Sequence, residues 1–288
     1  IGYRAFYECH NLESFVLPKS VTEISMGMFL ECYALKSLAV AEGHPTYDSR
    51  EGCNAIIETA TNKLLYGCCT TIIPDSVTVI GSGAFWDAKQ LKSIVIPHSV
   101  TNIEERAFAE CGLTEIDLPD SITSIAEYTF KSCLHLTKVN IPDSVEAIGS
   151  YAFTGCRELT DVTIGKGVKT INSWAFFENR ALANIVLPEG LKKIGKGAFC
   201  RTALTNVVIP NVSSLGVNAF NDCPLEEITL PAKISKLGDC AFWGDKTSPK
   251  VIKVPAGASD YYKNVKAIIR EGCYSCLPKE LYGNFVEI

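Results

Sequence analysis

One stretch of sequence decides the fold: Leu91-Lys92-Ser93-Ile94-Val95-Ile96-Pro97-His98-Ser99-Val100-Thr101-Asn102-Ile103, which continues to Ala107-Phe108 and Cys111. The same pattern recurs along the chain at regular intervals, which is the signature of an internal repeat. The phenylalanine of the Ala-Phe pair marks most copies and returns every 21 to 23 residues, with one gap of 56 residues. These phenylalanines are Phe6, Phe29, Phe85, Phe108, Phe130, Phe153, Phe176, Phe199, Phe220 and Phe242. The chain therefore contains about ten copies of one unit of roughly 23 residues, interrupted by one longer copy.

Each unit is predicted to form one short strand and one tight turn. In the copy Leu136–Ile141, Val139 and Ile141 alternate with polar residues, which is the period of a half-buried strand. Pro142 ends this strand, because proline has no N–H to donate to a ladder. We expect residues 149–153 to close the coil as a tight helical turn.

A single unit of this size cannot bury its own apolar face. Stacking the copies at the ~4.8 Å spacing of hydrogen-bonded strands joins their apolar residues into one continuous core. The predicted core residues of the best copy, with their equivalents in the other units, are Leu91, Ile94, Ile96, Val100, Ile103 and Phe108.

The consensus Leu-x-x-Ile-x-Ile-Pro-x-Ser-Val-x-x-Ile-Gly-x-x-Ala-Phe-x-x-Cys resembles the repeat of the BspA-type leucine-rich-repeat family, and the resemblance extends from residue 1 to about 255. That family is found on the surfaces of host-associated bacteria and some protozoan parasites. The resemblance implies a leucine-rich-repeat solenoid, a right-handed β/α superhelix with a parallel sheet on its concave side. It also implies adhesion or ligand binding at the cell surface, since some members bind host matrix or plasma proteins. The family has no shared catalytic residues, and the repeat does not determine the partner.

The domain organisation follows from the repeat. We expect the solenoid to span residues 1–255, with a longer variant repeat at 41–73 that resembles the hairpin-bearing repeat of the family. Residues 256–288 depart from the pattern and are predicted to form a C-terminal cap. The cap contains a short helix with apolar residues at helical spacing, beginning at Ser259 and ending at Gly272. Such a segment covers the open edge of a solenoid.

Composition and charge narrow the partners and the location. The chain has 288 residues, 47% of them hydrophobic and 20% charged, and a net charge of −5. Its Lys and Arg residues are scattered, which disfavours nucleic acid or an anionic membrane surface as a partner. No apolar run approaches the roughly 18 residues of a membrane-spanning helix. The chain opens within a repeat, since Ile1–Phe6 matches Ile80–Phe85, so we expect an extracellular or cell-surface piece of a longer precursor whose signal segment was removed.

The cysteines form three groups. Six of the thirteen lie three residues after the repeat phenylalanine and are predicted to be small core residues. Cys53 and Cys68 would face each other across a hairpin that turns at residues 60–62, and they form a possible disulfide, with Cys69 as a competing partner. Residues 273–276 form a lone Cys-x-x-Cys without a second pair, so we expect neither a metal site nor a redox-active pair. The cysteines of the repeat column are Cys9, Cys32, Cys111, Cys133, Cys156 and Cys223.

No motif of an enzyme active site is present in the sequence. His98 occupies the turn position after the proline, which Asp75 fills elsewhere, so a solvated turn is favoured over a general base. Asp117 and Asp161 are outward-facing strand residues, as charged residues of a solenoid commonly are. We therefore expect a protein that is not an enzyme and that has no cofactor.

Residues that vary between repeats are the expected site of recognition. Asn184, Val186, Asn206 and Val208 are predicted to form an apolar centre with amide edges, and we expect them to bind a ligand. The favoured function is a surface adhesin or ligand-binding module that recognises a host or extracellular protein through the concave sheet, as a monomer. The alternatives are a structural or self-associating surface module and, less favoured, a carbohydrate binder. The strand columns carry no ladder of exposed Trp or Tyr, which such a binder would need.

Overall fold

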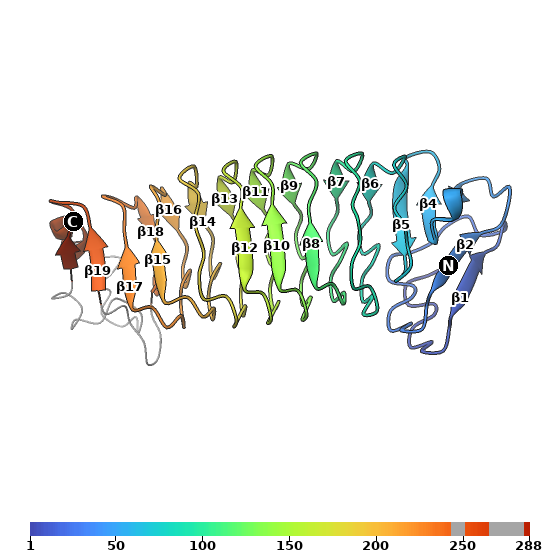
Figure 1. The fold of residues 1–288 in the computed structure, drawn as a ribbon, viewed down its shortest axis with the longest axis horizontal. Helices are drawn as coiled ribbons and strands as arrows, with labels where there is room; N and C mark the ends of the chain where they lie inside the picture. Colours follow the sequence, from blue (N-terminus) through green and yellow to red (C-terminus); the bar gives the residue numbers. More distant parts are fainter. Residues whose placement is uncertain (243–250, 265–284) are drawn as a thin grey trace.

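The protein is an elongated parallel β-solenoid in which consecutive coils lie side by side along one axis (Figure 1). The computed structural model describes residues 1–242, 251–264 and 285–288. The two ends of the chain lie at opposite ends of the solenoid, and about ten coils separate them, as the repeat predicts. The predicted solenoid is thus confirmed.

Two kinds of strand recur in the coils. The Leu-x-x-Ile-x-Ile segment forms the longer strands, and the face that carries this segment is named the long-strand face. These strands are β1 (Ser14–Leu17), β2 (Ser37–Val40), β8 (Glu115–Asp117), β10 (Lys138–Ile141), β12 (Asp161–Ile164), β15 (Asn206–Val208), β17 (Glu227–Thr229) and β19 (Val251–Val254). The segment after the proline forms two-residue strands on a second wall of the coil. These are β6 (Val79–Ile80), β7 (Asn102–Ile103), β9 (Ser124–Ile125), β11 (Ala147–Ile148), β13 (Thr170–Ile171), β14 (Lys193–Ile194), β16 (Ser214–Leu215) and β18 (Lys236–Leu237).

Equivalent residues of neighbouring units stand in register. In the parallel pairs of β10, Val139 lies beside Ile116 of β8 and Val162 of β12. The same holds on the second wall, where Ile148 of β11 lies beside Ile171 of β13. Because the register is in phase with the repeat, each apolar position of the sequence becomes a continuous row of side chains.

The turns that close the coils are not helical, and the prediction of helical turns is wrong. Around Phe108, the N–H groups of Ala107 and Ala109 donate to carbonyls three residues earlier, whereas those of Arg106, Phe108 and Glu110 donate to the next coil. Arg106 and Glu110 have φ angles of 56° and 60°, in the left-handed region. In most coils, the residues two positions before and two positions after the repeat phenylalanine also have a left-handed backbone conformation. This alternation turns every second N–H toward the neighbouring coil, which an α-helix could not do, because its N–H groups point along the helix axis to carbonyls of the same helix.

The phenylalanine column forms the centre of the core. From Phe85 to Phe242, consecutive rings stack with centroid distances of 5.0 to 5.9 Å. Of the predicted core residues in the best copy, five are buried and Ile94 is only half-buried. The repeat columns thus identify most of the core, but equivalents such as Val162 and Ile185 are only half-buried, and Cys9 of the cysteine column is exposed.

The long repeat interrupts the stack and separates two hydrophobic clusters. It contains β3 (Tyr47–Asp48), the 3₁₀ turn η1 (Arg50–Gly52) and the antiparallel pair of β4 (Ala55–Glu58) and β5 (Lys63–Gly67). The long repeat has no phenylalanine turn of its own between Phe29 and Phe85, and Tyr66 lies in its place. The Tyr66 ring contacts Phe29 edge-on at 5.5 Å, and its hydroxyl accepts a hydrogen bond from the N–H of Met28 at 2.9 Å. On the other side, the N–H of Gly67 donates to the carbonyl of Ala84 at 2.9 Å. The hairpin therefore joins the two parts of the solenoid.

The C-terminal segment begins with α1 (Ser259–Asn264). Tyr262 is buried against the last coils, and its hydroxyl donates to the carbonyl of Pro231 at 2.7 Å. The final strand, β20 (Phe285–Glu287), pairs in parallel with β19. The rest of the predicted helix up to Gly272 and the Cys-x-x-Cys of residues 273–276 lie outside the described residues.

Candidate binding surface

The residues predicted to bind a ligand lie on the long-strand face and reach solvent. Asn206 and Val208 are outward-facing residues of β15, and Asn184 and Val186 take the equivalent positions one coil earlier. Val186 is 83% exposed and Val208 is 64% exposed, and both asparagines are also exposed. The structure therefore presents these side chains on neighbouring coils, and their role in binding stays a prediction.

The sheet on this face is not continuous. Its strands fall into separate groups, β1 with β2, β8 with β10 and β12, and β15 with β17, β19 and β20. In the described part of the chain, residues 93–96 and 184–187 make no backbone hydrogen bond to a neighbouring coil. The expectation that every unit supplies a strand is therefore wrong at these two units, one of which is the best copy of the repeat.

The breaks in the sheet coincide with exposed aliphatic side chains. Val95, Val186 and Ile72 are 84%, 83% and 75% exposed, which makes them the three most exposed large hydrophobic residues of the described chain. Val95 and Val186 lie within the two breaks, and Ile72 lies in the coil before Val95. Exposed aliphatic side chains are ordinary when scattered, but a gathering of them indicates an interaction surface.

A groove of about 550 Å³ lies over the first break. Three consecutive coils form it, through residues 71–75, 93–97 and 115–117. Ile72 and Val95 are its exposed aliphatic lining residues, and its charged lining residues are Asp75, Glu115 and Asp117. This site was not predicted from the sequence, because Ile72 belongs to the long repeat. Ile72 lies two residues before Pro74, as Val186 lies two residues before Pro188, and this shared spacing is the signal that marks Ile72 as outward-facing.

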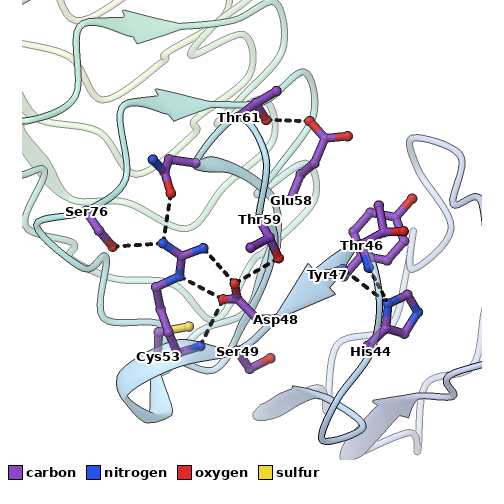
Figure 2. Close-up of polar contacts among 12 residues, drawn as sticks. His44, Thr46, Tyr47, Asp48, Ser49, Cys53, Glu58, Thr59, Thr61 and Ser76 are labelled. Atoms are coloured by element: carbon purple, nitrogen blue, oxygen red, sulfur yellow. Dashed lines mark hydrogen bonds and ion pairs between the residues drawn. The ribbon is translucent and has the colours of Figure 1, made fainter.

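A polar cluster next to the groove holds the long repeat to the following coil (Figure 2). The guanidinium of Arg50 donates from Nε and Nη2 to the carboxylate of Asp48, at 2.8 and 2.6 Å. Its Nη1 donates to Asn62 Oδ1 at 2.8 Å and to Ser76 Oγ at 3.4 Å. Ser76 follows Asp75 in the turn after Pro74, so this Arg50 cluster fixes one wall of the groove to the hairpin.

The comparison with family models settles which family these repeats represent. The description "BspA type Leucine rich repeat region" matches in six copies, over residues 1–61, 58–139 and 123–248. The chain belongs to the BspA-type leucine-rich-repeat family. The resemblance noted in the sequence is thus confirmed over most of the chain.

Several solved structures of bacterial leucine-rich-repeat proteins are similar to this BspA-type chain. A leucine-rich repeat protein from Bacteroides ovatus is 27% identical over 88% of this chain and 58% of its own, with a TM-score of 0.64. One from Eubacterium ventriosum is 24% identical over 66% of this chain and 59% of its own, with a TM-score of 0.54. A leucine rich cell surface protein from Faecalibacterium prausnitzii is 24% identical over 86% of this chain and 80% of its own, with a TM-score of 0.49. This chain therefore spans less than two thirds of the first two proteins, and no curated protein matches it.

The disulfide predicted for this BspA-type chain is not formed, and both Cys53 and Cys68 are free thiols. The hairpin register pairs Ala55 with Gly67, which, continued outward, would set Cys53 opposite Cys69 and not opposite Cys68. The two thiols also face different hydrophobic clusters, Cys53 the larger one and Cys68 the N-terminal one. Cys69 instead directs its thiol to the carbonyl of Leu35 at 3.4 Å.

The BspA-type coils carry an aromatic column, but not on the long-strand face. Tyr128, Tyr151 and Trp174 stack with centroid distances of 4.9 and 6.4 Å at half-buried turn positions. Arg106 covers the free face of Tyr128, and the backbone of Gly197 lies against the Trp174 ring, where a Cβ would come within 2.2 Å of it. Because neighbours cover the ring faces, these aromatics do not offer the open faces on which a sugar ring stacks.

The candidate catalytic and metal-binding groups are dispersed. His98 contacts Asp120 at 3.0 Å, and both side chains are about four-fifths exposed. Lys138 stands in register between Glu115 and Asp161, so these carboxylates do not adjoin. Among the described residues, no group of three or more His, Cys, Asp or Glu side chains is arranged to hold a metal ion. Nor does any helix in the described ranges have the length and apolar character needed to cross a membrane.

Proposed function

We propose that this BspA-type chain is a non-enzymatic binding module of a secreted or cell-surface protein, and that it recognises a protein partner through its long-strand face as a monomer. The observation that carries the proposal is the exposure of Val95, Val186 and Ile72 on one face, while most apolar positions of the repeat are buried in a continuous core. A solvent-exposed aliphatic side chain gains free energy when a partner covers it, at about 25 cal/mol per Å².

The location at the cell surface rests on the relatives. One structural neighbour is described as a leucine rich cell surface protein, and the family is found on bacterial surfaces. We extend this description to the present chain and propose that it is an adhesin whose partner is a host matrix or plasma protein.

The test is binding of the purified chain to a panel of immobilised matrix and plasma proteins. We compare the native chain with Val186→Lys/Val208→Lys and with Val16→Lys, which charges an exposed valine on the distant strand β1. Circular dichroism checks that each variant is folded. Saturable binding that the double variant loses by about tenfold or more, a change of about 1.4 kcal/mol, and that Val16→Lys retains supports both the function and the predicted residues.

Equal binding by the native chain and both variants would show that the predicted residues are not the binding site, although the proposed function would stand. These residues are Asn184, Val186, Asn206 and Val208. A structural or self-associating module is the second candidate, because the same exposed aliphatic residues could contact another copy of the chain. Absence of binding to every panel protein, together with a molar mass that rises with concentration in light scattering, would favour that candidate.

A further inference from the structure

The groove over the first break offers main-chain as well as side-chain contacts. From Ser93 to Ile96, within the described chain, no backbone N–H or C=O forms a hydrogen bond to the main chain of either neighbouring coil. The next strand along the face, β8, pairs only with β10, so the edge of β8 that faces residues 93–96 also has no strand partner. Unpaired backbone groups along an open groove can form hydrogen bonds with water or with polar groups of a ligand.

The groove has one sign of charge. Its charged lining residues are the exposed carboxylates Asp75, Glu115 and Asp117, and no Lys or Arg is among the lining residues described. Lys138 lies beside Glu115 on the next strand and offsets part of this charge. Asp117 accepts a hydrogen bond from Asn140 Nδ2 at 2.8 Å, which fixes its carboxylate at the rim. The predicted patch around Val186 and Val208, by contrast, has amide neighbours without charge.

The dimensions suit a short extended segment. The groove crosses three coils, and two steps of ~4.8 Å give roughly 10 Å, the length of about three extended residues. Ile72 and Val95 stand on consecutive coils of this path. A segment lying along it can cover both aliphatic side chains and bring alternate side chains to the acidic rim.

We propose that the groove formed by residues 71–75, 93–97 and 115–117 binds an extended segment of a partner protein in which aliphatic and basic side chains alternate. The proposal rests on the proposed function and names the chemistry of the partner. Ile72 and Val95 contact the aliphatic side chains, and Asp75, Glu115 and Asp117 attract the lysines or arginines. The net charge of −5 assists the encounter of the chain with a basic partner.

The test uses four fluorescein-labelled octapeptides that repeat Val-Lys, Ser-Lys, Val-Ser or Val-Glu, with the affinity measured by fluorescence anisotropy. We expect saturable binding of the Val-Lys peptide with one site per chain, and binding at least about tenfold weaker for the other three. That factor corresponds to about 1.4 kcal/mol. Two groove variants, Ile72→Ser/Val95→Ser and Asp75→Asn/Glu115→Gln, should each weaken Val-Lys binding by about tenfold.

Matched controls remove the same groups elsewhere. Val16→Ser/Val217→Ser removes two exposed valines outside the groove, and Glu42→Gln/Glu189→Gln neutralises two exposed carboxylates. Both should bind the Val-Lys peptide within about twofold of the native chain. The proposal is overturned if the Val-Lys peptide does not saturate, if Ser-Lys binds equally well, or if the controls weaken binding as much as the groove variants do. If a panel protein binds through Val186 and Val208 and its binding does not depend on the groove, the proposed function stands and this inference is wrong.

Discussion

At the scale of single residues, the cysteine column has a role that its apolar character did not predict. The buried thiols donate hydrogen bonds to the phenylalanine carbonyl of the preceding coil, as Cys111 does to Phe85 at 2.8 Å and Cys133 does to Phe108 at 3.1 Å. Burial raises the pKa of Cys133 to about 12, so this thiol stays protonated and keeps its donor at physiological pH. These cysteines are therefore neutral links between coils and not reactive groups.

Asn179 occupies the same column but does not make this link. It is fully buried, and neither its Nδ2 nor its Oδ1 has a hydrogen-bond partner in the described structure. A buried polar group without a partner costs about 1–3 kcal/mol. We expect Asn179→Cys to raise the free energy of unfolding by about 1 kcal/mol, measured by urea denaturation.

The control for this substitution is Thr202→Cys. The Thr202 hydroxyl already donates to the carbonyl of Phe199 at 3.0 Å, so a thiol there should bring no gain. If Asn179→Cys leaves the urea midpoint unchanged or lowers it, the amide does not carry the cost assigned to it.

At the scale of elements, the long repeat depends on Arg50 to hold its hairpin. Burial disfavours the ionised form of Asp48, but hydrogen bonds from Arg50 and Thr59 outweigh this effect, and the pKa of Asp48 is lowered. A lowered folded-state pKa means that the stabilisation is present above the ordinary value of 3.8 and is lost as the pH falls through the folded value.

Arg50→Met should destabilise the hairpin by about 1–2 kcal/mol at neutral pH, because it removes charge-assisted hydrogen bonds between side chains that are less than one third exposed. The readout is amide hydrogen exchange in β4 and β5. The difference from the native chain should shrink once the pH falls below 3.8, as Asp48 becomes protonated. Arg157→Met is the control, since Arg157 is 61% exposed and reaches Glu178 only at 3.9 Å. An equal effect of both variants would contradict the role of the Arg50 cluster in stabilising the hairpin.

At the scale of the whole molecule, stability is distributed along the stack. Each coil contacts mainly its neighbours, and the long repeat divides the apolar core into a small N-terminal cluster and a large second cluster. Solenoids of this kind are stabilised by the sum of their units and of the interfaces between them. Damage in one coil should therefore stay local.

Phe153→Ala removes a ring that stacks at 5.2 Å on both Phe130 and Phe176. We expect a loss of about 3–5 kcal/mol in that region, seen as faster hydrogen exchange in β10, β11, β12 and β13. Amides of β1 and β2 should keep their native rates, whereas Phe29→Ala should produce the reverse pattern. Uniform acceleration along the chain in either variant would show that the molecule unfolds as one cooperative unit.

The sequence by itself determined the repeat, the number of coils, the family, the core columns and the outward position of Val186 and Val208. These features follow from local periodicity, because a side chain's place within its own coil depends on a few neighbouring residues. The disulfide between Cys53 and Cys68 and the helical turns were wrong, since the first depends on the register within the hairpin and the second on hydrogen bonds between coils. Only the tertiary structure decided that the sheet opens at residues 93–96 and 184–187 and that Ile72 joins Val95 in an acidic groove. Hydrogen bonding between coils depends on how stacked segments are positioned relative to each other, and the residue pattern within one unit does not specify that positioning.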